Sequence, residues 1–172
     1  MQATSPTSSS QSYYKIVFLG KRGVGKTLLI QELLRSSSNS EHEPIGIEYH
    51  NLELKYKNKI HYLQFWDLSS NFDEKIDLFL RNTSLVVFVF DFKDKESQKY
   101  VINLYEEVTK ELSVKLIFAG ITKKEGKAKA SKEFTNWTKE NEFFIHQVNL
   151  QNDEGISQLL QLIVKQIYHE ED

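Results

Sequence analysis

The sequence contains no cysteine. This absence excludes disulfides, thiolate zinc sites, a cysteine nucleophile, prenylation and palmitoylation, because each of them needs a thiol. A strong net charge is also missing: 22 Lys and Arg residues nearly balance 24 Asp and Glu residues, so the formal net charge is −2. A balance this close to neutral argues against a broad electrostatic surface for nucleic acid.

Long apolar runs are absent as well. No run reaches the ~18 residues that a membrane span requires, and the polar residues 1–12 lack the apolar stretch of a secretory signal. Gln2 also rules out myristoylation at that end. We therefore expect a soluble cytoplasmic protein without a lipid anchor or membrane insertion.

The sequence does have enough apolar material for a packed core. Of its 172 residues, 40% are hydrophobic and 12% are aromatic, which is too many for a disordered chain. We expect a disordered tail over residues 1–12, one domain over residues 13–169 and an acidic tail over residues 170–172. The Ser-rich residues 36–43 predict a mobile loop inside that domain.

Apolar runs alternate with amphipathic stretches along the expected domain. Runs rich in β-branched and aromatic residues predict strands at residues 16–19, 51–56, 60–66, 85–90, 116–119 and 143–145. Apolar residues at helical spacing predict helices at residues 27–34, 101–112, 131–140 and 156–167, the second with its cap near Ser97. This alternation predicts an α/β fold with a mostly parallel sheet, whose ligands bind beyond the carboxyl ends of the strands.

One segment carries a motif with a defined chemistry. It matches the phosphate-loop pattern G-x-x-x-x-G-K-[ST] and consists of Gly20, Lys21, Arg22, Gly23, Val24, Gly25, Lys26 and Thr27. The segment follows a predicted strand directly and opens a predicted helix. Phosphate binding requires that context, which disfavours an accidental glycine-rich turn. The sequence therefore predicts a nucleotide-phosphate site at residues 20–27.

The residue types in this segment suit a triphosphate. Glycines allow the backbone to curl so that successive N–H groups point at phosphate oxygens, and the N-terminus of the following helix adds positive potential. Lys26 supplies a compact cation for the β and γ phosphates. The Thr27 hydroxyl is a hard oxygen ligand of the kind that Mg²⁺ prefers.

The same segment resembles the phosphate loop of Ras/Rab-type small GTPases. The resemblance includes residues 44–49, which are similar to the Rab segment that enters the second strand, and residues 65–67, Phe-Trp-Asp, which resemble the end of the third. It covers residues 13–168 and implies a P-loop NTPase fold: a six-stranded, mostly parallel sheet with helices on both faces. GTP or GDP with Mg²⁺ are the implied cofactors, with Asp67 reaching the metal through water.

Base recognition is less well preserved in this resemblance. The family has Asn-Lys-x-Asp after the fifth strand, whereas this chain has Thr122-Lys123-Lys124-Glu125, displaced by one residue. The resemblance implies that Lys123 covers the guanine ring and that Glu125 replaces the aspartate, with Thr122 in the same nucleotide-binding set. A solvated charged loop is an equally good interpretation. Residues 149–151 take the place of the last family motif.

Several positions depart from the family where its switches and hydrolysis depend on them. Pro44 stands at the place of the first-switch threonine, Ser70 replaces a glycine that senses the γ phosphate, and Asn71 replaces the glutamine that orients water. Catalysis of phosphoryl transfer depends mainly on how accurately the reacting groups are positioned. We therefore expect GTP hydrolysis to be slow or absent and assign no catalytic residue. Arg22 stands where Ras proteins have glycine. We favour a solvated loop cation there over a phosphate contact or a built-in arginine finger.

Two hypotheses from different classes follow. The first is a guanine-nucleotide-binding protein that acts through protein partners. The second is a pseudo-GTPase that serves as a structural subunit of a stable complex, with the cilium as one place for it, because some Rab-like subunits of ciliary complexes also lack lipid tails. An ATP-binding P-loop protein is a third possibility. Four aromatic residues either form a partner surface near the switches or pack between sheet and helix: Tyr49, Trp66, Phe72 and Phe79.

Overall fold

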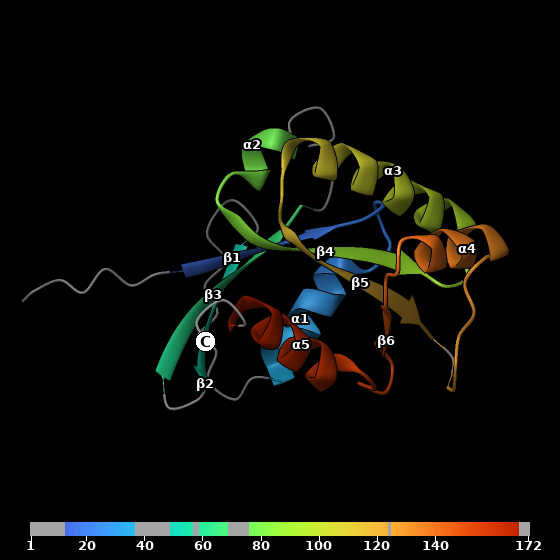
Figure 1. Ribbon diagram of the computed structural model, residues 1–172. Coiled ribbons are helices and arrows are strands. Elements are labelled where there is room, and N and C mark those ends of the chain that lie inside the picture. Colours follow the sequence, from blue (N-terminus) through green and yellow to red (C-terminus); the bar gives the residue numbers. More distant parts are fainter. Residues whose placement is uncertain (1–12, 37–48, 57–58, 69–75, 124, 169–172) are drawn as a thin grey trace, which may run out of the picture.

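Six strands form one sheet in the order β2-β3-β1-β4-β5-β6 in the computed structural model (Figure 1). The structure describes residues 13–36, 49–56, 59–68, 76–123 and 125–168. The strands are β1 Tyr13–Leu19, β2 Tyr49–Tyr56, β3 Lys59–Asp67, β4 Thr83–Asp91, β5 Lys115–Thr122 and β6 Ile145–Asn149. Only β2 runs antiparallel to its neighbour, and the other pairs are parallel. The predicted six-stranded, mostly parallel sheet is confirmed.

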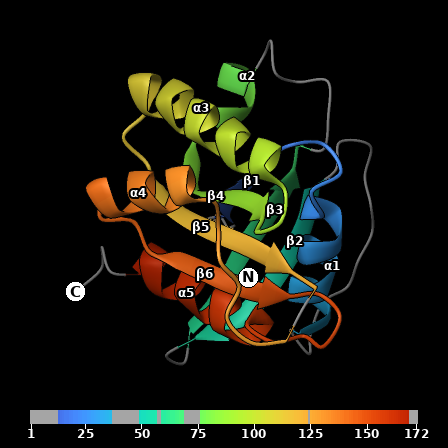
Figure 2. The same cartoon turned by 90° about the vertical axis from the view of Figure 1, so that its right-hand side faces the viewer.

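Helices cover both faces of this sheet. They are α1 Lys26–Ser36, α2 Ile76–Leu80, α3 Lys95–Glu111, α4 Lys132–Glu140 and α5 Ile156–Tyr168. Figures 1 and 2 show α1 and α5 on one face and α2, α3 and α4 on the other. The described residues contain no helix with the length and apolar character of a membrane span.

Strand β4 shows why the centre of the sheet is stable. Its residues 85–90 are fully buried, and successive side chains alternate between two apolar cores. Val87 and Val89 contribute to the core under α1 and α5, whereas Phe88 and Phe90 contribute to the core under α3 and α4. Each such side chain contributes about 1.5–3 kcal/mol on burial. The central strands are therefore held from both faces, and their carboxyl ends form a fixed edge.

Two predictions of local structure are wrong. The cap of α3 is Asp94, whose carboxylate accepts a hydrogen bond from the Glu96 amide at 3.0 Å. Ser97 lies inside the first turn instead, where its hydroxyl donates to the Asp94 carbonyl at 2.7 Å. The predicted strand at residues 143–145 begins only at Ile145, and Phe144 is 94% exposed. An apolar run alone did not distinguish a strand from the exposed turn before it.

Some expectations concern residues outside the described ranges. These are the two predicted tails, most of the polar loop at 36–43, the substituted switch positions Pro44, Ser70 and Asn71, and the aromatic residue Phe72. They stay predictions.

Candidate functional site

The phosphate-loop segment, residues 20–27, lies at the carboxyl edge of the sheet between β1 and α1. Two of its glycines are required by close packing. A Cβ on Gly20 would lie 2.2 Å from the Val89 carbonyl oxygen in β4. Gly25 has a φ of +111°, and a Cβ there would lie 3.0 Å from Cδ1 of Ile121 in β5. The loop therefore runs directly against the ends of two neighbouring strands, which only glycine permits.

The middle of the loop is tightly turned but open. The Val24 amide donates to the Lys21 carbonyl at 3.2 Å. Gly23 has a φ of +76°, and among the residues that the structure describes no heavy atom beyond its chain neighbours lies within 4 Å of the place of its missing Cβ. The Leu29 amide donates to the Gly25 carbonyl at 2.9 Å, so helical bonding starts at the last glycine. The backbone thus turns tightly at the start of α1, next to the helix N-terminus, the arrangement that binds phosphate in other proteins.

Lys26 is buried in this loop, with 3% of its surface exposed. Its ammonium donates to the Gly20 carbonyl at 2.7 Å and to the Lys21 carbonyl at 3.1 Å. A buried lysine is rare unless its charge is compensated by hydrogen-bond acceptors. The side chain therefore folds back over the loop, which places its positive charge beside the loop carbonyls.

The two predicted metal ligands lie in direct contact. The Thr27 hydroxyl, in the first turn of α1, donates a hydrogen bond to Oδ2 of Asp67 at the end of β3. The parallel register of β1 and β3 pairs Phe18 with Asp67, which brings this carboxylate level with the start of the loop. Asp67 is only 3% exposed. Hydroxyl and carboxylate oxygens are the donors that Mg²⁺ prefers, so this pair fits a Mg²⁺ site.

An ion pair connects the loop to the next helix. Lys21 Nζ lies 3.3 Å from Oδ2 of Asp94, the cap of α3, and about two fifths of each side chain is exposed, 39% and 41%. Burial alone raises the pKa of Asp94. Hydrogen bonds from the amides of Ser97 and Glu96 and from Lys21 outweigh this, so its pKa lies below the usual 3.8. The phosphate loop is thus held on its outer side by a carboxylate that stays ionised.

Arg22 lies next to this ion pair and is exposed. Among the described residues it forms no ion pair or hydrogen bond. This placement agrees with the solvated loop cation that the sequence favours. It leaves the interior of the loop to backbone groups and to Lys26.

The predicted base-recognition residues divide into a buried and an exposed set. Thr122 ends β5 and is 4% exposed, and it pairs in register with Asn149, which ends β6 and is 2% exposed. Lys123 and Glu125 lie beyond the strand and are exposed. The structure therefore brings Thr122 to the carboxyl edge beside the phosphate loop and leaves the two charged side chains to reach a base from outside the sheet.

Asn149 organises the loop that faces this region. Its side-chain oxygen accepts a hydrogen bond from the Gln151 backbone amide at 2.9 Å. Its backbone amide donates a hydrogen bond to the Glu154 carbonyl at 2.8 Å. The next residue, Leu150, has Cδ1 3.5 Å from the place of a Cβ on Gly25. The turn after β6 is consequently packed against the phosphate loop.

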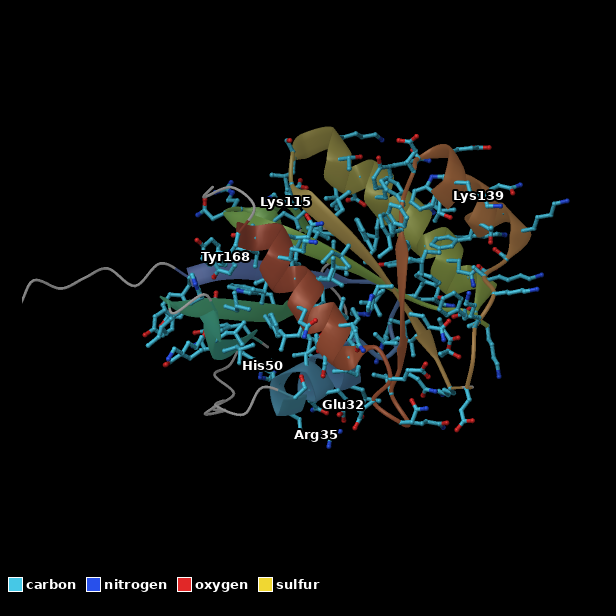
Figure 3. All side chains as sticks on the ribbon, turned by 60° about the horizontal axis from the view of Figure 1, so that its bottom comes forward. Glu32, Arg35, His50, Lys115, Lys139 and Tyr168 are labelled. Atoms are coloured by element: carbon cyan, nitrogen blue, oxygen red, sulfur yellow. The ribbon has the colours of Figure 1, made fainter. Side chains whose placement is uncertain are left out.

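A second contact joins the same turn to α1. Arg35, in the last turn of α1, lies 2.8 Å from Oδ2 of Asp153 and also pairs with Glu32. Figure 3 shows Glu32 and Arg35 together at the end of the helix. The hydrogen bond to Glu32, and to a smaller extent the one to Asp153, raises the pKa of Arg35. These exposed pairs add little stability individually, but they connect the phosphate helix to the turn after β6.

Sequence reasoning missed two residues that support this edge. Asp94 could have been identified as a cap, because an Asx residue before an amphipathic stretch is a helix-start signal. Gln98 is 1% exposed, donates to the carbonyls of Asp91 and Phe92, both at 3.1 Å, and accepts from the Ser131 amide at 2.9 Å. It connects the end of β4 to the start of α4, and no local pattern signals that role.

The aromatic residues near the predicted switches are half-buried. Tyr49 and Trp66 stack at 5.3 Å, and Phe79 lies 6.5 Å from Trp66. Lys15 Nζ lies 4.1 Å from the centroid of the Trp66 ring and donates to the carbonyls of Phe79 and Arg81. Burial lowers the pKa of Lys15. Trp66 and Phe79 pack partly against the core under α3 and α4, as the packing alternative predicts. A partner surface at these rings stays a prediction.

Comparison with known proteins agrees with this geometry. The model of the family described as Roc, the Ras of Complex domain of DAPkinase, matches residues 15–125, which include the phosphate loop, Asp67 and Glu125. The chain is also similar to Ras-related protein RabV of Dictyostelium discoideum, with 27% identity over 122 residues. That similarity covers 66% of this chain and 52% of RabV, so the chain spans about half the length of the curated relative it matches. The chain belongs to the Roc family and is a Ras/Rab-like small GTPase.

Proposed function

We propose that this chain binds GTP or GDP through residues 20–27 and acts through protein partners. The observation that carries the proposal is the open glycine-built loop against β4 and β5, with the buried Lys26 ammonium folded over it. Members of the Ras-like family normally bind guanine nucleotides with Mg²⁺. The loop amides and Lys26 then hold the phosphates by charge-assisted hydrogen bonds.

Thr27 and Asp67 are the residues that would hold Mg²⁺. They already lie within hydrogen-bond distance, at the positions where α1 begins and β3 ends. When bound, the ion neutralises phosphate charge and fixes the orientation of the β and γ phosphates. Burial of Asp67 favours the retention of a cation beside it, because an ionised carboxylate with low exposure needs a compensating charge.

Recognition of the base is assigned to the loop after β5. Glu125 accepts hydrogen bonds from the guanine N–H groups, the Lys123 stem covers the ring, and Thr122 forms the inner wall. The exposure of Lys123 and Glu125 supports this assignment, because both side chains are available to a ligand. The fixed turn after β6, held by Asn149 and packed against Gly25, supports a base site that is continuous with the phosphate loop.

Hydrolysis is proposed to be slow or absent. Ser70 and Asn71 replace the residues with which the family senses the γ phosphate and orients water. A misplacement of about 1 Å costs roughly 100-fold in rate. We therefore assign no catalytic residue in this chain and expect its function to depend on binding.

The direct test is a titration of the purified chain with fluorescent mant-GDP and mant-ADP, each with Mg²⁺ and with EDTA. We expect binding of mant-GDP that weakens in EDTA, and weaker binding of mant-ADP. A preference for mant-ADP would assign the chain to adenine nucleotides, and equal, metal-independent binding of both would contradict the proposal. A single-turnover assay with GTP should show hydrolysis no faster than the intrinsic rate of ordinary small GTPases.

A second candidate is a structural subunit of a stable complex, in the cytoplasm or the cilium, that uses the fold for contacts. One observation favours it: contacts within the chain stabilise the phosphate loop, through Lys26 on the loop carbonyls and Lys21 on Asp94. A loop held in this way keeps its shape without phosphate. Thermal melting separates the two candidates, since a nucleotide-independent subunit shows the same Tm with and without Mg-GTP.

A further inference from the structure

A cavity of about 830 Å³ lies beside β6, away from the phosphate loop. Its walls are the loop at residues 126–130, strand β6 and the first turn of α5. Neither the phosphate-loop residues nor Thr122, Lys123 and Glu125 line it. The cavity is within the size range of protein ligand sites. The cavity therefore lies outside the residues assigned to nucleotide binding.

The cavity follows the outer edge of the sheet, where part of β6 is already in contact with the turn after it. The Asn149 backbone amide donates to the Glu154 carbonyl, and the Gln147 carbonyl oxygen lies 2.2 Å from the place of a Cβ on Gly155. Strand β6 is the last strand in the sheet order, and within the described residues it pairs only with β5 (Figure 2). An edge strand presents backbone N–H and C=O groups that can pair with another extended chain. The occupant that this edge favours is thus an extended peptide segment.

The opposite wall is held in place by Gln147 of β6. Its side-chain oxygen accepts from the Ala128 amide at 2.8 Å, and its side-chain nitrogen donates to the Gly126 carbonyl at 2.7 Å. On the α5 side, the His146 ring nitrogen lies 2.8 Å from the Gly155 carbonyl. Both walls are therefore fixed to β6 before any ligand binds, which lowers the entropic cost of binding.

The loop wall is basic. Lys127 and Lys129 line the cavity and are exposed, and residues 126–132 include a third lysine, Lys132, but no acidic residue. Within the ranges that the structure describes, Lys127 and Lys129 form no ion pair. Glu154 is the one acidic residue that lines the cavity, so two cations face one carboxylate. The wall favours an acidic occupant.

The inner surface is apolar. Phe92, Ala130 and Ile145 line the cavity and are partly buried against the core under α3 and α4. An apolar side chain of moderate size can pack there while its neighbours in an extended chain face the lysines. Side chains in an extended segment alternate between two directions. The surface therefore matches a sequence in which acidic and apolar residues alternate.

We propose that this cavity binds an acidic, extended segment of a partner protein. The segment adds to the start of β6 at Ile145, its carboxylates contact Lys127 and Lys129, and one apolar side chain packs on Phe92 and Ile145. Nucleic acid fits poorly, because the chain as a whole has a net charge of −2. The site needs no nucleotide, so it stands independently of the proposed function.

The test uses the full chain and a fluorescein-labelled peptide of four Glu-Val repeats, followed by fluorescence anisotropy. Wild-type protein should bind it and should not bind a Lys-Val peptide of the same length. The double variant Lys127→Glu with Lys129→Glu should weaken binding about tenfold or more. The matched control is Lys110→Glu with Lys139→Glu, which changes the net charge equally at exposed positions of α3 and α4 outside the cavity, Lys139 being labelled in Figure 3.

A third variant tests the cavity without changing charge. Ala128→Trp fills the space beside Gln147 and should also weaken binding, while thermal melting reports whether each variant stays folded. Equal weakening by the two charge-reversed pairs would reduce the interaction to general electrostatics and overturn the proposal. The proposal would also be overturned if the peptide did not bind the wild type at 50 mM salt. Displacement of the peptide by Mg-GTP would overturn it too, because it would assign the peptide to the phosphate loop.

Discussion

Two parts of the carboxyl edge of the sheet are built in different ways. We call the phosphate loop, residues 20–27, the phosphate side, and the residues proposed to bind the base, Thr122, Lys123 and Glu125 with Asn149 beside them, the base side. On the phosphate side, backbone geometry determines the shape: a Cβ on Gly20 would lie 2.2 Å from the Val89 carbonyl oxygen, and Gly25 has a φ of +111°. On the base side, Thr122 and Asn149 are buried at the strand ends, but the groups that would meet a ligand are the exposed side chains Lys123 and Glu125. One side is fixed by main-chain packing, the other by side chains on a loop.

This difference explains which motif is preserved. A loop shaped by its main chain tolerates few substitutions: an added Cβ at Gly20 meets a backbone carbonyl, and a side chain at Gly25 is strained by the positive φ. A base contact made by a side chain can shift by one residue and by one methylene, as the Thr122–Glu125 segment requires. We therefore expect mutations on the phosphate side to have larger effects than those on the base side.

The largest effect is expected from Lys26→Met. The change removes charge-assisted hydrogen bonds to phosphate worth about 3 kcal/mol, so affinity for mant-GDP should fall roughly 100-fold. Lys123→Met is the matched control on the base side, because it removes the same charge from an exposed position and should cost tenfold or less. If the two variants weaken binding equally, the contrast between the two sides is wrong.

The second-largest effect is expected on the stability of the folded chain, from the substitution Gly20→Ala. Its Cβ would lie 2.2 Å from the Val89 carbonyl oxygen, so β1 or β4 must shift, and the free energy of unfolding should fall by about 2–3 kcal/mol in urea denaturation. Gly23→Ala is the control, since no described residue beyond its chain neighbours lies within 4 Å of its Cβ position and the strain of a φ of +76° is left, about 1–2 kcal/mol. A larger loss at Gly23 than at Gly20 would show that backbone strain, not contact with β4, shapes the loop.

A smaller effect is expected from Glu125→Ala on the choice of base. Wild-type protein should prefer GDP to IDP, which lacks the 2-amino group, because Glu125 accepts hydrogen bonds from guanine. The variant should bind GDP about tenfold more weakly and lose that preference, while its affinity for IDP changes less. An unchanged GDP-to-IDP ratio would support the solvated-loop interpretation of Lys123 and Glu125.

The smallest effect concerns the ion pair between Lys21 and Asp94. Asn at position 94 keeps the helix cap but removes the charge, so Asp94→Asn should cost less than about 1 kcal/mol at pH 7. The pKa of Asp94 is depressed in the folded state, so its contribution is present above its unfolded pKa of about 3.8 and is lost as the pH falls through the lower folded value. The stability difference between wild type and variant should therefore shrink between pH 4 and pH 2. A difference that grows in this range would mean that the Asp94 pKa is raised.

The sequence predicted those parts of the molecule that depend on local pattern. The strand before Gly20 and the helix after it follow from apolar runs and from the phosphate-loop motif, and the structure brings the two predicted metal ligands, Thr27 and Asp67, together. The exposed Phe144 was misjudged, because an aromatic residue beside a strand has the same local pattern whether it faces the core or solvent. The contacts of Asp94 and Gln98 join residues far apart in the chain, which periodicity does not reveal.

Extraction of nucleotide from the purified chain tests the central claim most directly. Heat or acid treatment followed by ion-exchange chromatography should release GDP or GTP, in an amount that approaches one per chain. An empty extract, together with a Tm that does not change on adding Mg-GTP, would contradict the claim that residues 20–27 form a working phosphate site and would leave a protein that keeps only the architecture.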